Sequence, residues 1–477
     1  MRIRLSCPIT LSEFARHAGA ILNALERDGL RSVLYLTTDS REVEAGDLFI
    51  ALSSVSGFKV TYLQDALDRG ASAILMDSSL PSIANVATLL APDPLEALAT
   101  IAKWHLEKIS PRVIAITGSV GKTTTRHLLA TILRTCYRVH ESPHSYNNLL
   151  GCCLTILTMP FDTEYLVAEC GMDGPGQISR LSRLLAPNAA IITNIGLSHI
   201  EKLGSVEAIR NAKLEILDGM HGGSLFYPGE ASMLSPFVPH NAVPVYQSQQ
   251  KDHPYVTNVC VDGSGTTFDY VSPFRYQKEM RIPAFGTHIA HCAKLALALA
   301  ESEGVDSQSM YRGCANYESV DNRLKVYSFK DITVIDDSFN ASPDAMLSAL
   351  SSFSCIASHK KAILRIAVLG DMLELGKYRV ASHQKIGEKV SEVSTHLCAI
   401  GNNAYEYGSG AKRAGMSKEQ IWILPEKTNT ENLIKRLYQL VEHTPSAILF
   451  KGSHATPLAS LAKAFITKVA SMPERII

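Results

Sequence analysis

A short run between Arg112 and Thr125 constrains the fold more than any other part of the sequence. It reads RVIAITGSVGKTTT, so a β-branched apolar stretch meets a turn bounded by Gly118 and Gly121. Apolar side chains then recur at helical spacing, at Leu128, Leu129, Ile132, Leu133 and Cys136. The pattern predicts a strand, a loop and a helix in that order, which is typical of α/β folds with parallel sheets.

The loop in this run has the composition of a phosphate-binding turn. Glycines let backbone N–H groups face an anion, and the N-terminus of the following helix adds partial positive charge. Lys122 can reach terminal phosphates, and the Thr123 hydroxyl can ligate Mg²⁺. Ile116 stands where the general G-x-x-x-x-G-K-[ST] form needs its first glycine, so the loop is shorter than that form. We therefore expect nucleotide binding by a short variant of the loop.

Length and composition exclude several classes of protein. A chain of 477 residues suggests about three domains. The 46 basic and 46 acidic residues balance, so no nucleic-acid partner is expected. Ten cysteines without a C-x-x-C pair disfavour a zinc cage or a disulfide framework, and a reducing cytoplasm is the simplest setting. No run of 18 apolar residues occurs, so no membrane span is expected.

Apolar runs alternate with helical patterns over the first hundred or so residues, and they predict a small α/β domain. The polar segment Asp39-Ser40-Arg41 lies between two of its expected strands, and taken alone it is an ordinary turn. A break at residues 91–94 precedes a helix that carries Trp104. We place the first domain at residues 1–108.

Three further residues of the expected middle domain, residues 109–320, are candidates for a metal site. Glu169 ends an apolar strand, and His199 follows another strand; the carboxyl ends of strands are where ligands bind in α/β sheets. Alone, His199 is as well explained as a loop histidine. Lys213 falls on the apolar stripe of an expected helix, 206–217. Two explanations of this position stay open. Either the lysine is chemically altered, or its apolar stem covers the core while its ammonium group reaches water.

The expected third domain, residues 321–477, resembles a doubly wound sheet. Strands at 332–335, 363–369 and 447–450 each end in polar residues, and helical patterns separate them. The segment lacks G-x-G-x-x-G, which disfavours a dinucleotide. Residues 220–285 predict hairpins and loops, and a packed helix is expected from His288 to Ser302.

These motifs together resemble the Mur ligase family along the whole chain. The most specific are DSR at 39–41, the loop at 118–125, TNIG at 193–196 with His199, DDSFNASP at 336–343 and VLGDMLELG at 368–376. The resemblance implies three domains: one that binds a UDP-sugar substrate, a central P-loop ATPase-type parallel sheet, and a C-terminal Rossmann-like domain that closes over the site.

The resemblance also implies roles for individual residues. Thr123 and Glu169 would hold one Mg²⁺, and His199 with a carbamylated Lys213 would serve a second, so that Lys122, Lys213 and His199 form the catalytic set. Two larger sets would bind substrates. ATP would be bound by Gly118, Ser119, Val120, Gly121, Lys122, Thr123, Thr124, Arg323, Asp337 and Asn340. The UDP-sugar substrate would be bound by Ser40, Arg41, Asn147 and Asn148.

The implied reaction is an ATP-dependent amide ligation in peptidoglycan precursor synthesis, hence in cell wall biogenesis. D-alanyl-D-alanine or a related dipeptide would be added to a UDP-N-acetylmuramoyl-tripeptide through an acyl phosphate. The partners would be these small molecules alone, with the protein acting as a cytoplasmic monomer.

The chain departs from the family pattern at several positions that concern substrate or base recognition. They are Leu149, where a glutamate is common, Ile289 and Cys292, where asparagines are common, and His454, where an arginine is common. Two alternatives therefore stay open: an amide ligase of another pathway, and a nucleotide-binding regulatory relative without ligase activity.

Overall fold

The computed structural model describes residues 1–24, 26–52, 60–80, 83, 86–143, 145–454 and 456–471. The chain divides into two compact units. The first comprises Met1–Ile116, Tyr137–Ala190 and Glu215–Gly223, and the second comprises Thr117–Cys136, Ile191–Leu214 and Ser224–Ile477. Each unit is described by itself below.

The first sheet, in the first unit, has the strand order β1-β3-β4-β5-β6-β2. Its strands are β1 (Arg2–Thr10), β2 (Ile21–Asn23), β3 (Ser32–Thr37), β4 (Leu48–Ile50), β5 (Ala73–Asp77) and β6 (Ala87–Ala91). The four inner strands are parallel, and β1 and β2 pair antiparallel at the two edges. The helical elements are α1 (Leu11–Ala18), α2 (Glu26–Gly29), η1 (Ser40–Glu42) and α3 (Val60–Asp68). Phe49, Ile74 and Leu63 belong to the core between this sheet and α3.

Helix α4 (Pro94–Ile109) follows the break that the sequence predicts. The Asp93 side chain accepts hydrogen bonds from the backbone N–H groups of Leu95 and Glu96, and Pro94 takes the first helical position, where its missing N–H costs nothing. The helix ends at Ser110, whose left-handed backbone (φ 53°) stops further helical turns. The break and the helix are thus confirmed.

The middle sheet has the strand order β12-β11-β10-β7-β9-β8. Its strands are β7 (Arg112–Thr117), β8 (Val139–Glu141), β9 (Tyr165–Glu169), β10 (Ala189–Ile192), β11 (Leu225–Pro228) and β12 (Val243–Val245). The helical elements of this part are α5 (Lys122–Leu133), α6 (Leu149–Leu157), α7 (Gln177–Leu185), α8 (Ile200–Leu203), α9 (Val206–Leu214), η2 (Glu215–Leu217) and η3 (Ser235–Phe237). Strands β7, β8 and β9 pair in parallel, as the alternation of strand and helix predicts.

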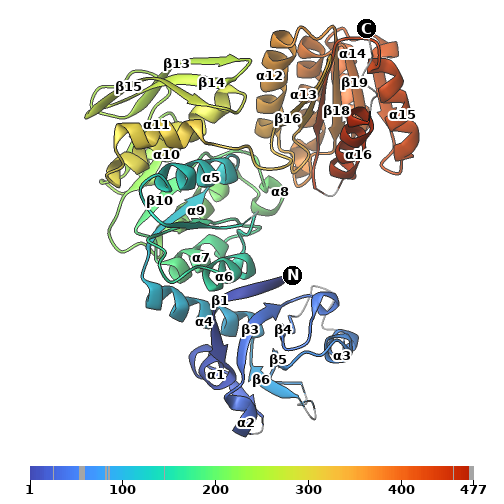
Figure 1. Ribbon diagram of the computed structural model, residues 1–477. Coiled ribbons are helices and arrows are strands. Elements are labelled where there is room, and N and C mark those ends of the chain that lie inside the picture. The colour runs from blue at the N-terminus through green and yellow to red at the C-terminus, as the bar shows by residue number, and fades with distance from the viewer. Residues whose placement is uncertain are drawn as a thin grey trace. The chain divides into compact units, whose positions relative to one another are not determined.

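A three-stranded antiparallel sheet and two helices follow in the second unit. The strands are β13 (Tyr255–Asp262), β14 (Gly265–Ser272) and β15 (Arg275–Ile282), which confirms the predicted hairpins. The helices are α10 (Thr287–Ser302) and α11 (Ser307–Ala315), and both pack against α5 (Figure 1). Helix α10 is buried on most sides, from Ile289 to Ala300, which explains why its sequence is rich in alanine and leucine.

The C-terminal sheet has the strand order β16-β17-β21-β18-β19-β20. Its strands are β16 (Lys325–Phe329), β17 (Ile332–Asp336), β18 (Leu364–Gly370), β19 (His396–Ile400), β20 (Ile421–Leu424) and β21 (Ser446–Lys451). The helical elements are α12 (Pro343–His359), η4 (Gly376–Tyr378), α13 (Arg379–Val393), α14 (Ala404–Arg413), η5 (Lys418–Gln420), α15 (Thr430–Val441) and α16 (Leu458–Ala470). Helices α12 and α13 lie on one side of the sheet, and α15 and α16 on the other (Figure 1).

The central strands of this sheet, β17, β21 and β18, are buried almost throughout, because helices cover both faces. All strand pairs except β16–β17 are parallel. The predicted α/β class with a central parallel sheet and a doubly wound C-terminal sheet is confirmed. The boundaries at 1–108, 109–320 and 321–477 stay a prediction. In the described part of the chain, no helix is both long and apolar enough to cross a membrane.

Candidate active site

The predicted phosphate loop lies between β7 and α5. Strand β7 ends at Thr117, and α5 begins at Lys122 with Gly121 as its N-cap. Gly118 (φ 145°) and Gly121 (φ 84°) both have backbone conformations that side chains disfavour. A Cβ on Gly118 would also overlap the Thr193 hydroxyl. These two glycines are therefore required by the path of the loop.

The residues after β10 hold the loop in place. Asn194 accepts two backbone hydrogen bonds from it, at 2.8 Å from Val120 N–H to its Oδ1 and at 3.2 Å from Ser119 N–H to its carbonyl oxygen. The Thr193 hydroxyl donates to the Val120 carbonyl oxygen at 2.6 Å. No role was predicted for Asn194 or Thr193, although both belong to the motif at 193–196. Their position directly after a strand that ends at this edge of the sheet was the available signal.

Lys122 reaches back across the loop. Its Nζ donates to the Gly118 carbonyl oxygen at 2.8 Å, so the ammonium group lies over the turn. Thr123, the next residue of α5, is only 1% exposed. Lys122 and Thr123 therefore both belong to the first turn of α5. A phosphate with a bound cation requires this arrangement, in which an ammonium group and a hydroxyl lie at the N-terminus of one helix.

Glu169 ends β9 in the first unit and pairs with Ile116 of β7, two residues before the loop begins. Its side chain is buried, and its Oε1 accepts a hydrogen bond from Asn147 Nδ2 at 3.1 Å. The Ser142 hydroxyl accepts the Glu169 backbone N–H at 3.2 Å. The predicted position of Glu169 at the carboxyl end of a strand is thus observed, and Asn147 is in contact with its carboxylate.

Lys213 lies on α9 in the second unit, with only 1% of the residue exposed. The alternative of a stem that covers the core while its ammonium stays in water is therefore wrong, because such an ammonium would be exposed. His199 follows β10 in a left-handed backbone conformation (φ 64°). Its pKa is lowered, first by burial, and the Lys213 and Lys122 charges lower it further, while Glu374 acts in the opposite direction. These charged groups thus lie close enough to act on one imidazole.

Glu374 is a further residue of this site; it belongs to the motif at 368–376, but no role was predicted for it. It belongs to the loop after β18, and its Oε2 lies 2.5 Å from His199 Nδ1. Its Oε1 forms an ion pair with Lys202 at 3.4 Å. The two partners are 175 positions apart in the chain, and no local sequence pattern connects loops at such a separation.

Two residues predicted to bind the nucleotide, Asp337 and Asn340, contact Lys451 at the carboxyl edge of the C-terminal sheet, and a third, Arg323, lies beside Phe339. Lys451 Nζ contacts the Asp337 carboxylate at 2.7 Å and the Asn340 carbonyl oxygen at 3.0 Å. The Arg323 guanidinium stacks over the Phe339 ring at 4.1 Å. His454, one of the departures from the family pattern, is exposed. Its ring packs edge-on against the Phe339 ring, with 6.0 Å between the ring centroids.

The first two turns of α10 carry the departures Ile289 and Cys292. Ile289 is buried, and the Cys292 thiol lies 3.1 Å from the position that a Cβ on Gly121 would take. Burial raises the pKa of the Cys292 thiol to about 11, so it stays neutral at pH 7. His288 of the same helix has a pKa lowered by burial to about 4, with Asp337 among the charges that act on it. Cys292 therefore lies against the loop, and His288 in the same helix lies close enough to Asp337 and Lys451 to be affected by their charges.

The predicted substrate residues of the first unit have structural partners. The buried Ser40 donates to Asp65 and thereby lowers the pKa of that carboxyl. Arg41 is largely exposed and forms an ion pair with Asp39 at 2.6 Å. Asn148 is the N-cap of α6, where its side chain accepts the Gly151 N–H. Leu149, the first residue of α6, is half-buried.

Within each unit, the donor groups suit a hard divalent cation. Glu169 offers a buried carboxylate, Thr123 a buried hydroxyl, and His199 an imidazole. Oxygen ligands are the ones that Mg²⁺ prefers, and a neutral imidazole can also bind a metal ion. Each of these groups, taken by itself, therefore fits the chemistry of a metal ligand.

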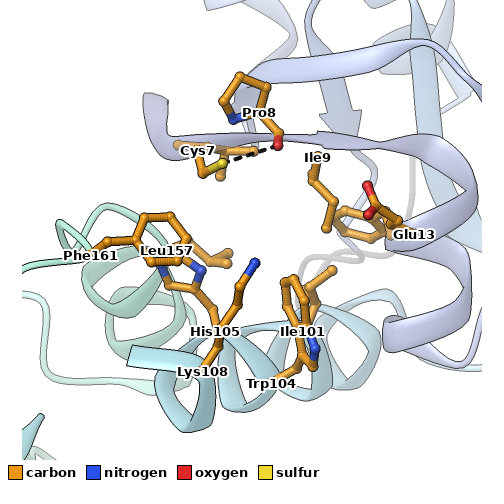
Figure 2. Close-up of a pocket in the computed structure, with 12 residues that line it drawn as sticks. Cys7, Pro8, Ile9, Glu13, Ile101, Trp104, His105, Lys108, Leu157 and Phe161 are labelled. Atoms are coloured by element: carbon orange, nitrogen blue, oxygen red, sulfur yellow. Dashed lines mark hydrogen bonds between the residues drawn. The ribbon is translucent and has the colours of Figure 1, made fainter. Parts of the chain in front are cut away.

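A cavity of about 60 Å³ lies in the first unit (Figure 2). Strand β1 forms one wall, α4 contributes Trp104, His105 and Lys108, and Phe161 closes one side. Lys108 Nζ lies about 5 Å from the ring centroids of Trp104 and Phe161. Among the described residues that line this cavity, none belongs to the predicted site.

Comparison with known proteins agrees with this arrangement. Residues 116–300 match the Mur ligase middle domain, and residues 322–454 match the Mur ligase, glutamate ligase domain. The UDP-N-acetylmuramoyl-tripeptide–D-alanyl-D-alanine ligase of Bacillus subtilis is 34% identical over 90% of this chain and 93% of its own length. The protein of the same name from Synechocystis is 32% identical over 87% of this chain and 93% of its own length.

Solved structures show the same fold. MurF from Acinetobacter baumannii superposes with a TM-score of 0.84 at 24% identity, covering 98% of this chain and all of that one. MurF from Thermotoga maritima, solved in complex with ADP, superposes with a TM-score of 0.77 at 24% identity, covering 91% and 97%.

The parallel sheet, the short glycine loop and the helix that begins at Lys122 define a nucleotide-binding α/β protein of the P-loop class. With the two matched domains and the full-length relatives, the family follows. The chain belongs to the Mur ligase family, whose members are ATP-dependent ligases that form an amide bond.

Proposed function

We propose that this protein joins D-alanyl-D-alanine, or a related dipeptide, to a UDP-N-acetylmuramoyl-tripeptide at the expense of ATP, in peptidoglycan precursor synthesis. The observation that carries the proposal is the 34% identity to the Bacillus subtilis enzyme of that name over 90% of the chain. The P-loop geometry at Gly118–Lys122 supports the use of ATP.

The proposed reaction has two steps. A carboxylate oxygen of the tripeptide attacks the γ-phosphorus of ATP, ADP leaves, and an acyl phosphate forms. The dipeptide amine then attacks the acyl carbon, loses a proton, and expels phosphate through a tetrahedral intermediate. Positioning and charge neutralisation supply most of the acceleration in phosphoryl transfer, so the residues that hold the phosphates matter most.

Lys122 is the proposed phosphate-binding cation, because its Nζ lies over the loop at 2.8 Å from the Gly118 carbonyl oxygen. The backbone of Gly118–Thr124 would surround the phosphates, with the N-terminus of α5 adding partial positive charge. Arg323, Asp337 and Asn340 are proposed to bind the remainder of the nucleotide. Ser40, Arg41, Asn147 and Asn148 are proposed for the UDP-sugar substrate.

Two magnesium ions are proposed, one held by Thr123 and Glu169 and the other by His199 and Lys213. When bound, the ions neutralise the negative charge of the transferring phosphoryl group. His199 would offer a ring nitrogen, and the buried Glu169 carboxylate an oxygen.

Lys213 is proposed to carry a carbamate. Its neutral amine would add to CO₂ and release one proton, which replaces a buried cation by an oxygen anion suited to magnesium. The support is its 1% exposure, because a charged ammonium is costly at a buried position and a carbamate would offer oxygen ligands to the proposed ion.

The remaining assignments follow from the proposed reaction. Residues 1–108 would bind the UDP-sugar, residues 109–320 ATP, and residues 321–477 would close on the site. All substrates are small and water-soluble, and ATP is a cytoplasmic nucleotide, so we place a monomeric enzyme in the cytoplasm.

A second candidate is a nucleotide-binding regulator without ligase activity. The observation that favours it is the position of Cys292, a departure from the family pattern that packs directly against Gly121 of the loop. In that case ATP would bind, but no amide would form.

The test is a phosphate-release assay that crosses UDP-muramoyl-tripeptides, with lysine or diaminopimelate as third residue, against D-alanyl-D-alanine and related dipeptides. The proposal predicts phosphate release that needs both a tripeptide and a dipeptide. ATP binding with no stimulation by any pair would favour the regulator instead.

A further inference from the structure

Two residues with unusual backbone conformations meet at the edge of the proposed metal site. His199 (φ 64°) and Glu374 (φ 60°) are both left-handed, although neither is a glycine. Residues other than glycine rarely adopt this conformation, because it brings Cβ too close to the following carbonyl oxygen. Strain of this kind persists where the surrounding structure imposes it, and it concentrates at functional sites. Here both strained residues are partners in one hydrogen bond.

The hydrogen bond determines the form of the imidazole. The distance from His199 Nδ1 to Glu374 Oε2 is 2.5 Å, and an ionised carboxylate can only accept. Nδ1 therefore carries the proton that is donated to Glu374. In a neutral ring, Nε2 then keeps its lone pair, which is the form of histidine that binds a metal.

The loop that carries Glu374 is firmly held. At its start, the buried Asp371 carboxylate accepts backbone N–H groups from Asn402 and Asn403, both at 2.9 Å. Within it, Met372 N–H donates to His383 Nε2 at 3.1 Å. The Glu374 carbonyl oxygen itself accepts the Glu201 N–H at 3.1 Å. Glu374 is therefore presented to His199 by fixed backbone and not by a mobile side chain alone.

We propose that Glu374 is a positioning residue that orients His199 for the second magnesium ion, so that a loop of the C-terminal sheet completes the metal site of the middle segment. The inference rests on the proposed function, which assigns His199 to that ion. A carboxylate behind a metal-binding histidine fixes the ring and raises its basicity, and loss of such a partner typically weakens metal binding 10- to 100-fold.

The experiment measures Mn²⁺ binding to the full-length protein with saturating ADP, by counting free Mn²⁺ with electron paramagnetic resonance. We expect Glu374→Ala to weaken the His199-dependent site about tenfold. Glu374→Gln keeps a neutral acceptor and should weaken it less, by about threefold, because charged acceptors form the stronger bonds. Lys202→Ala is the matched control, since it removes the other partner of Glu374 and should leave Mn²⁺ affinity within about twofold.

His199→Ala separates the two proposals. If it weakens Mn²⁺ binding and neither Glu374 variant does, the role of Glu374 is wrong and the metal role of His199 stands. If His199→Ala has no effect, the second metal site fails and the inference fails with it. Thermal unfolding is recorded for each variant; should Glu374→Ala not fold, unchanged Mn²⁺ affinity in Glu374→Gln alone overturns the inference.

Discussion

The Asn194 side chain fixes the phosphate loop by accepting the Val120 N–H at 2.8 Å. An equivalent bond exists at the other end of β7, where Asn188 Oδ1 accepts the Val113 N–H at 2.7 Å. The two asparagines make the same kind of bond to backbone at opposite ends of one strand, and only Asn194 is next to the loop. Replacing each asparagine in turn therefore distinguishes an effect on the geometry of the loop from an effect on the overall stability of the protein.

Asn194→Ala is therefore expected to weaken ADP binding about fivefold, because a hydrogen bond that shapes the loop contributes roughly 1 kcal/mol. Asn188→Ala should lower the free energy of unfolding by a similar amount and leave ADP affinity unchanged. Calorimetric titration with ADP and urea unfolding of both variants provide the check. Equal loss of ADP affinity in the two variants would contradict a specific role for Asn194.

Lys122→Met is expected to lower kcat by at least about a hundredfold, since it removes the cation that lies over the loop and keeps the apolar stem. The thermal midpoint should change little, because the ammonium is only half-buried. Initial rates of ADP formation with both substrates measure the effect. Near-normal ligation by this variant would refute the assignment of the loop as the phosphate site.

Gly118→Ala is expected to abolish nucleotide binding. An added Cβ would overlap the Thr193 hydroxyl, and φ 145° is unfavourable for alanine. The control is Gly204→Ala, at φ 80°, where no heavy atom lies within 4 Å of the new Cβ. That variant should lose only about 1 kcal/mol of stability and keep its ADP affinity. Normal binding by Gly118→Ala would show that the loop path differs from the one described.

The ion pair between Lys294 and Glu230 predicts an asymmetric response to mutation. Lys294 is only 1% exposed, whereas the Glu230 side chain is 40% exposed, and the two groups lie 2.8 Å apart. Glu230→Gln leaves a buried ammonium without its carboxylate and should cost about 3 kcal/mol. Lys294→Met leaves a carboxylate that water can solvate and should cost about 1 kcal/mol or less. Urea unfolding at pH 7 measures both, and equal costs would contradict this explanation.

The same pair predicts a pH dependence. Burial lowers the pKa of Lys294 below its usual 10.5. Between the lowered value and 10.5, the unfolded chain binds more protons than the folded one, so this residue makes stability rise with pH. Glu230→Gln removes the group that opposes the shift, so the rise should begin at a lower pH than in the wild type. Urea unfolding at pH 7, 8 and 9 measures whether the free energy of unfolding rises more steeply with pH in Glu230→Gln than in the wild type.

The local parts of this fold could be predicted from sequence because short-range patterns determine them. The apolar stretch before Gly118 became β7, the helical spacing after it became α5, and Lys213 on an apolar stripe proved to be buried. Glu169 was expected at the end of a strand and is found there. In each case the periodicity of a few residues was enough.

The contacts between distant loops could not be predicted in the same way. Glu374 and His199 are both left-handed and meet across 175 positions of the chain. Glu374 lies in the motif at 368–376 and His199 follows the motif at 193–196, but neither motif indicates that the two side chains are in contact. Asp344 likewise approaches Gly196 so closely that a Cβ there would overlap its carboxylate. Such contacts depend on how separate sheets are joined, and no local periodicity encodes that.

The most direct test of the proposed ligation uses a UDP-muramoyl-tripeptide in which both oxygens of the reacting carboxylate are ¹⁸O. Attack of that carboxylate on the γ-phosphorus transfers one labelled oxygen to the phosphate that the dipeptide amine later expels. Mass spectrometry of the released phosphate should therefore find one ¹⁸O per phosphate, together with the elongated peptide. Phosphate released without label, in the presence of both substrates, would contradict the account.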